Sequence, residues 1–202
     1  MARAPKEKPA RAWQRMLSGR RLDLLDPSPL DVEIEDIAHG LARVARWNGQ
    51  TTGNAIFSVA QHSVLVSDIF TLQVPTADLA TRLMVLLHDA PEYVIGDMIS
   101  PFKAVIGESY KGVEARLLSA IHLRFGLPPV TPPVVKTATK RADKVAAFLE
   151  ATRLAGFGIA ESCRIFGDPR PFPATMEALS LTPQTAEEAK AAFLARFAEL
   201  FP

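Results

Sequence analysis

Apolar residues recur at helical spacing along most of this chain, and no segment alternates apolar and polar residues as a half-buried strand would. This periodicity predicts an all-α protein, a single helical bundle of about seven helices. The predicted helices cover residues 10–17, 34–47, 58–70, 75–88, 108–125, 134–154 and 182–201. Since 48% of the 202 residues are apolar, the chain can bury a sizeable core within one domain.

The segments outside these helices are rich in proline, glycine or charge. Residues 1–10 are basic and contain two prolines, so we expect a disordered arm, with one domain over residues 11–202. No apolar segment follows these basic residues, so we expect no secretory signal. The proline cluster at 128–133 predicts a loop. Residues 156–202 are expected to form an irregular segment, at 156–175, and then a C-terminal helix that begins at Thr182-Pro183.

Charge and composition exclude several classes of function. Lys and Arg number 23 against 22 Asp and Glu, a balance that argues against a nucleic-acid polymer as partner but allows a small phosphorylated ligand. The only cysteine, Cys163, excludes an intramolecular disulfide and a thiolate metal cluster. No apolar run approaches the length of a membrane span. We therefore expect a cytoplasmic protein that does not bind membranes.

Metal-binding residue types end or interrupt three of the predicted helices. His88 and Asp89 end the apolar helix in LMVLLHDAPEYVIGD (83–97), and His62 lies inside the apolar helix SVAQHSVLVSDIF. Asp143 lies in the middle of the helix KRADKVAAFLE, where burying an unpaired carboxylate would be costly. Two imidazoles and two carboxylates can satisfy one another by sharing a divalent metal. This donor set suits Mn²⁺, Fe²⁺, Co²⁺, Mg²⁺ or Zn²⁺.

Two more carboxylates follow the His88-Asp89 pair. Glu92 comes four residues after His88, and would share a helix face with it if the helix continued past Pro91. It could deprotonate or orient a metal-activated water. Asp97 follows a glycine, and could protonate a leaving oxygen.

The order of the four ligands resembles the H…HD…D signature of the HD-domain metal-dependent phosphohydrolases. The segment HDAPEYVIGDMISPFK (88–103) is similar to the HD–x–x–E–(x)4–D–(x)3–P–x–K pattern of their bacterial 5′-deoxynucleotidase branch. RWNGQT (46–51) and KRADKVAAFLE (140–150) fit that branch as well, and the resemblance spans residues 34 to 155. It implies an HD-domain helical fold, a homodimer and catalytic roles for Glu92 and Asp97. The metal ligands that it implies are His62, His88, Asp89 and Asp143.

The resemblance also implies that an Arg-Trp pair, here Arg46 and Trp47, contacts the substrate and helps to select the deoxyribose. An arginine suits this role because its planar guanidinium can meet two phosphate oxygens at once. Arg43 and His39 precede Arg46 by three and seven residues, so we expect a cationic helix face toward the metal.

These residues predict an enzyme that hydrolyses (deoxy)nucleoside 5′-monophosphates to nucleoside and phosphate. One alternative is a hydrolase of a larger nucleotide, such as a pyrophosphorylated guanosine or a nucleoside triphosphate. Another is a non-catalytic HD domain that binds metal and nucleotide as a sensor or scaffold. Such a domain would not need Glu92 and Asp97, and the presence of both favours an enzyme.

Overall fold

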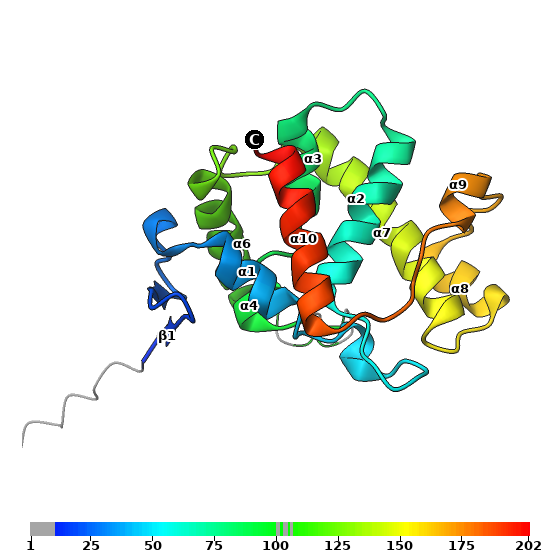
Figure 1. Cartoon of the computed structure of the whole chain (residues 1–202), viewed down its shortest axis with the longest axis horizontal. Coiled ribbons are helices and arrows are strands. Elements are labelled where there is room, and N and C mark those ends of the chain that lie inside the picture. The colour runs from blue at the N-terminus through cyan, green and yellow to red at the C-terminus, as the bar shows by residue number, and fades with distance from the viewer. Residues whose placement is uncertain (1–10, 100–101, 103–104, 106) are drawn as a thin grey trace, which may run out of the picture.

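The computed structural model describes residues 11–99, 102, 105 and 107–202, so the arm predicted at 1–10 lies outside the described residues. The fold is all-α, as predicted, with one two-stranded antiparallel sheet in the described part (Figure 1). The α-helices are α1 (Ile34–Leu41), α2 (Val59–Gln73), α3 (Leu79–Leu86), α4 (Glu92–Ile95), α6 (Glu108–Arg124), α7 (Pro133–Arg153), α8 (Ile159–Phe166), α9 (Ala174–Glu177) and α10 (Ala186–Leu200). In the described residues, we find no helix long and apolar enough to cross a membrane.

Helix α2 is the centre of the bundle. It packs against α3, α7 and α10 (Figure 1). Its side chains are buried on nearly all sides. Its N-cap is Ser58, whose hydroxyl accepts a hydrogen bond from the Gln61 backbone N–H. A helix surrounded by other helices has no solvent for its polar side chains, so a histidine on α2 must find its partners inside the protein.

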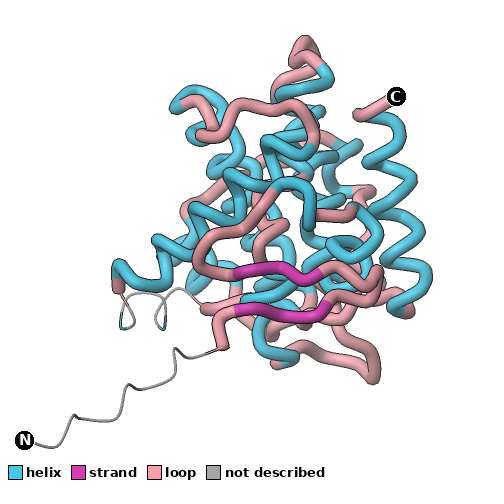
Figure 2. The backbone as a smooth tube through the Cα atoms, turned by 90° about the vertical axis from the view of Figure 1, so that its left-hand side faces the viewer, coloured by secondary structure: helices cyan, strands magenta, loops and turns pink. Residues whose placement is uncertain are grey.

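The helix predicted at residues 10–17 is wrong, because this segment forms a hairpin. Strand β1 (Trp13–Arg15) pairs with β2 (Arg21–Asp23), as Figure 2 shows. Gln14 lies opposite the fully buried Leu22. The intervening Ser18 donates hydrogen bonds from its backbone N–H and its hydroxyl to the carboxylate of Asp36. These contacts with α1 hold the turn, and they are distant in the sequence, so the local apolar pattern did not reveal them.

The helix predicted over 34–47 ends early, at Leu41. Beyond it, Ala45 and Ser58 form an isolated antiparallel bridge, and the Arg46 backbone N–H donates to the Phe57 carbonyl. The chain then enters a 3₁₀ turn, η2 (Arg46–Gly49), in which Trp47 and Asn48 have positive φ angles of 57° and 51°. This pairing with the start of α2 takes Arg46 and Trp47 off the axis of α1.

Three later boundaries also differ from the prediction. Helix α3 begins at Leu79, after the N-cap Asp78, rather than at Pro75. Helix α10 begins at Ala186, because the side chain of Gln61 binds the backbone of Thr182 and Gln184 and holds that stretch outside the helix. The segment expected to be irregular, 156–175, contains α8 and the first residues of α9. Two of its glycines, Gly158 and Gly167, cap the two ends of α8 and do not interrupt it.

The close packing of α1 on α4 predicts that Gly40→Ala destabilises the protein. A Cβ at residue 40 would lie 2.7 Å from the backbone oxygen of Tyr93 and 2.8 Å from its Cβ. Overpacking of this kind costs about 1–3 kcal/mol, which thermal unfolding would detect. The matched control is Gly112→Ala in α6, where the new Cβ meets only Arg116 Nη1 at 3.4 Å. We expect the control to gain about 0.5–1 kcal/mol from helix propensity. Equal melting of the Gly40→Ala and parent proteins would contradict this packing.

Candidate metal centre

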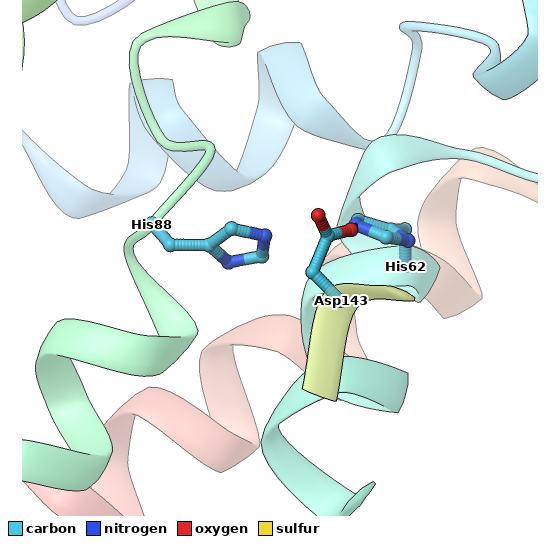
Figure 3. Close-up of side chains that lie close together, drawn as sticks. All are labelled: His62, His88 and Asp143. Carbon is cyan, nitrogen blue, oxygen red and sulfur yellow. The ribbon is translucent and has the colours of Figure 1, made fainter. Parts of the chain in front are cut away.

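The four predicted ligands come from helices that pack on one another. His62 lies in the first turn of α2, His88 and Asp89 follow the end of α3, and Asp143 lies in the middle of α7. Contacts between α2, α3 and α7 bring these positions together. Figure 3 shows the ring of His88 extending toward Asp143 and His62. His62, His88 and Asp143 form a group that could hold a metal ion, with one ligand atom from each lying within 4.8 Å of the others.

Asp89 completes the cluster. Its Oδ2 atom lies 3.4 Å from Nε2 of His62 and 3.2 Å from Nε2 of His88. Asp143 Oδ1 lies 3.3 Å from the same Nε2 atom of His62. Both imidazoles therefore present the same ring atom, Nε2, to the two carboxylates.

The other ring nitrogen of each imidazole, Nδ1, lies at hydrogen-bond distance from an oxygen atom outside the cluster. Nδ1 of His88 lies 2.8 Å from the Val85 carbonyl oxygen, and Nδ1 of His62 lies 2.6 Å from Glu150 Oε1. A carbonyl oxygen only accepts, so Nδ1 of His88 carries a proton, and the neutral form of this ring has its lone pair on Nε2. Within the described residues, the buried Nε2 atoms of both histidines have no hydrogen-bond partner. A metal-binding histidine usually binds the metal through one ring nitrogen while its other ring nitrogen donates to a carboxylate or a carbonyl. Both histidines have this arrangement, so the residues fit a divalent ion.

The cluster opens to solvent on its carboxylate side. The side chain of His62 is fully buried, whereas those of Asp89 and Asp143 are 24% and 38% exposed. Burial and Arg46 lower the pKa of His62, but Glu150, Asp143 and Asp89 outweigh them and raise this pKa well above its usual value. Burial raises the pKa of Asp89, but the two histidines outweigh it and hold that pKa well below its usual value. The surrounding field therefore favours a positive charge at the centre of the cluster.

Arg46 and Trp47 lie beside this cluster, in the turn η2. Arg46 donates from Nη1 to Asp97 Oδ2 at 2.9 Å and from Nε to Glu150 Oε2 at 3.3 Å. Trp47 donates from Nε1 to the same Glu150 oxygen at 2.9 Å. Burial lowers the pKa of Arg46, but the carboxylates of Glu150, Asp97, Asp89 and Glu92 outweigh it, so this guanidinium stays charged.

The backbone positions Glu92 and Asp97 differently from the prediction. The helix does not continue past Pro91; tight turns follow α3, and Glu92 begins the separate helix α4. Glu92 is buried, with 2% of its surface exposed. Gly96, with a positive φ of 77°, then turns the chain so that Asp97 meets Arg46. Asp97 therefore lies in an ion pair in this structure.

The expected cationic helix face is wrong. Arg43 is exposed, and its guanidinium donates to the backbone carbonyl of His39. His39 lines a separate cavity of about 370 Å³ with Met16, Asp36 and Tyr93. Because α1 ends at Leu41, Arg46 no longer shares a helix face with either residue.

Glu150 also belongs to this site, although it is not among the site residues predicted from the sequence. It is completely buried on α7, where it contacts His62, Trp47 and Arg46. Burial raises the pKa of Glu150, but His62 and Arg46 outweigh it and lower this pKa. The signal was present in KRADKVAAFLE: Glu150 follows Asp143 by seven residues and lies among apolar neighbours, so both carboxylates share one helix face.

Fold and site together define an all-α protein with a candidate metal centre of two histidines and two aspartates. Its sequence is 59% identical, over 186 residues, to the uncharacterized protein RCAP_rcc00048 of Rhodobacter capsulatus, a match that covers 92% of this chain and 94% of that protein. The chain belongs to the family of this Rhodobacter protein. It is also 33% identical over 119 residues to the uncharacterized protein YfdR of Escherichia coli, covering 56% of this chain and 61% of YfdR. No protein-family model matches the chain.

Proposed function

We propose that this chain is an HD-domain phosphohydrolase of the 5′-deoxynucleotidase type. It hydrolyses (deoxy)nucleoside 5′-monophosphates to nucleoside and inorganic phosphate, and it acts in the cytoplasm as a homodimer. The observation that supports this proposal most is the approach of two imidazole Nε2 atoms to the carboxylates of Asp89 and Asp143, within 3.2–3.4 Å. The order of these residues in the chain is also that of the H…HD…D signature.

The proposed cofactor is one divalent ion, held by His62, His88, Asp89 and Asp143. Two imidazoles and two carboxylates form a borderline-to-hard donor set, which suits Mn²⁺, Co²⁺, Fe²⁺, Mg²⁺ or Zn²⁺. When bound, such an ion supplies Lewis-acid chemistry, which activates water and polarises a phosphoryl oxygen.

The other side chains of the site would bind the substrate and move protons. The Arg46 guanidinium, whose Nη1 now donates to Asp97, binds the phosphate instead. This exchange releases Asp97, which can then take up a proton and give it to the leaving 5′-oxygen. Glu92 accepts the proton of the attacking water. Trp47, next to Arg46, contacts the sugar. One water is consumed, and one nucleoside and one phosphate are formed.

The test is phosphate release by the purified protein, stripped of metal with a chelator and then reloaded with Mn²⁺ or Co²⁺. Deoxynucleoside 5′-monophosphates should yield inorganic phosphate, and removal of metal should lower the rate at least about a thousandfold, since Lewis-acid stabilisation is worth several kcal/mol. No phosphate release with either Mn²⁺ or Co²⁺ would overturn the proposal.

The products separate the proposed function from its rivals. Phosphate released from monophosphates indicates a monoesterase, whereas pyrophosphate or triphosphate released from larger nucleotides indicates the second class of enzyme. Nucleotide and metal binding without any turnover would indicate a sensor or scaffold domain.

A further inference from the structure

Glu150 uses both of its carboxylate oxygens inside the protein. Oε1 lies 2.6 Å from His62 Nδ1. Oε2 accepts from Trp47 Nε1 at 2.9 Å and from Arg46 Nε at 3.3 Å. The residue is completely buried, so solvent does not compete for these contacts. One carboxylate thus joins the central helix α2, which carries a candidate metal ligand, to the turn η2, which carries the two candidate substrate contacts.

Helix α7 holds the His62 ring at both nitrogens. Asp143 and Glu150 are seven residues apart, about two helical turns, so they extend from the same face of α7. Asp143 Oδ1 approaches Nε2 at 3.3 Å, and Glu150 Oε1 approaches Nδ1 at 2.6 Å. Only the Nε2 side faces Asp89 and His88. Glu150 therefore acts behind the ring and is not itself placed as a ligand.

An ionised carboxylate can satisfy all three of its partners, because it only accepts hydrogen bonds. Glu150 thereby requires a proton on Nδ1 of His62, so the neutral ring that can bind a metal has its lone pair on Nε2, the nitrogen that faces the cluster. Its other oxygen accepts from both the indole and the guanidinium. An amide at this position could not serve all three groups, since one of its two ends is a donor.

The turn that Glu150 anchors has an unusual backbone. Trp47 and Asn48 have φ angles of 57° and 51°, a left-handed conformation that is unfavourable for residues with a Cβ. The contacts of the indole offset this cost: its N–H donates to Glu150, and its ring lies 5.5 Å from that of Phe157 and 6.0 Å from that of Phe166. Without the Glu150 acceptor, the half-buried indole N–H would lose its partner and the turn would lose part of its support.

We infer that Glu150 is a positioning residue that couples the metal centre to the substrate-binding turn. It orients His62 toward the ion and, with its second oxygen, fixes Arg46 and Trp47 beside it. Metal binding at His62 is then transmitted to the indole of Trp47 through one buried carboxylate. This inference rests on the proposed metal site, and it adds a residue outside the ligand set and the proton-transfer pair.

The first test is the Co²⁺ affinity of Glu150→Gln, followed by the visible absorption of the bound ion. The oxygen of the glutamine amide can accept a hydrogen bond either from His62 or from the turn η2. Its NH₂ group then faces the donors of the other partner and cannot accept from them. Loss of a group that orients a metal-binding histidine lowers metal affinity about 10–100-fold. Glu161→Gln, an exposed carboxylate on α8, is the control and should bind Co²⁺ like the parent. Unchanged affinity in Glu150→Gln would overturn the inference.

The second test uses Trp47 as a reporter. The chain has two tryptophans, so Trp13→Phe, in the N-terminal hairpin, leaves Trp47 as the sole emitter. Titration with Zn²⁺, which lacks d–d transitions, should shift the Trp47 emission up to one equivalent. The shift should disappear when Glu150→Gln is added. If Zn²⁺ binds and the Trp47 emission stays constant in the Trp13→Phe protein, the inferred coupling between the metal centre and Trp47 is wrong. This measurement does not need the Glu150→Gln variant, so it tests the coupling even if that variant fails to fold.

Failure of the inference and failure of the proposed function give different results. A parent protein that binds neither Co²⁺ nor Zn²⁺ removes the metal site, and with it both proposals. A parent that binds metal, together with a Glu150→Gln variant that binds it equally well, removes only the role of Glu150. A merely structural role would lower the melting temperature of Glu150→Gln and leave its metal affinity, and the response of Trp47 to Zn²⁺, unchanged.

Discussion

Asp143→Ala should yield a folded protein that binds no stoichiometric divalent metal and releases no measurable phosphate from deoxynucleotides. The substitution removes the carboxylate that lies 3.3 Å from His62 Nε2, and with it one of four proposed ligands. We expect a loss of at least about a thousandfold in rate, because the Lewis-acid contribution of the ion is lost with it. Metal content by elemental analysis and phosphate release, measured on the same sample, check the two halves of this expectation.

The fold should survive this change. The side chain of Asp143 is 38% exposed, and alanine has a higher helix propensity than aspartate by a few tenths of a kcal/mol. This gain opposes the loss of the 3.3 Å contact between Asp143 and His62, so the metal-free Asp143→Ala protein should melt close to the temperature of the metal-free parent. Lys144→Ala, at the exposed neighbouring position of α7, is the matched control and should keep both metal and activity. A variant at Asp143 that retains its metal would show that this aspartate is not a ligand.

Glu92→Gln should show the opposite combination, with metal retained and turnover lost. Glutamine has nearly the shape of glutamate but cannot accept the proton of the attacking water. A positioned general base contributes about 10²–10⁴-fold, so kcat should fall by that factor while KM changes little. Glu92 is 2% exposed, so an isosteric change is needed to leave its buried surroundings intact. Steady-state kinetics with metal-loaded protein, alongside metal analysis, make the measurement.

Two other outcomes for Glu92→Gln would each change its assignment. Loss of metal together with activity would make Glu92 a further ligand. Turnover within a few-fold of the parent would show that Glu92 is not the base that accepts the proton of the attacking water. The control is Glu35→Gln, since Glu35 also lies in the first turn of a helix but is largely exposed and pairs with Lys190. Its activity should equal that of the parent.

The sequence predicted the long buried helices and the clustering of the metal-binding residue types. Helices α2, α6 and α7 have apolar repeats long enough to define them, and their boundaries agree with the prediction within a few residues. His62 and Asp143 were found because a histidine and an aspartate on apolar helices need a buried partner. Their spatial meeting follows from the packing of α2 on α7.

What the sequence did not reveal depends on contacts between distant segments. The hairpin is held by Ser18 and Asp36, and the start of α10 is delayed by Gln61. The turn at Trp47 has a conformation that a tryptophan seldom adopts, and its indole contacts Glu150. Glu150 itself was overlooked because a glutamate near the end of a helix usually lies in solvent. In each case, a local pattern favoured the commoner structure, and a long-range hydrogen bond selected another.

The seven-residue interval between Asp143 and Glu150 limits how this family can vary in length. Each residue inserted into or deleted from a helix rotates everything beyond it by about 100°. One such change between these two positions would turn either the aspartate or the glutamate away from His62. Insertions and deletions among relatives should therefore collect in the loops around α7, such as 125–132 and 154–158, and spare the interval itself.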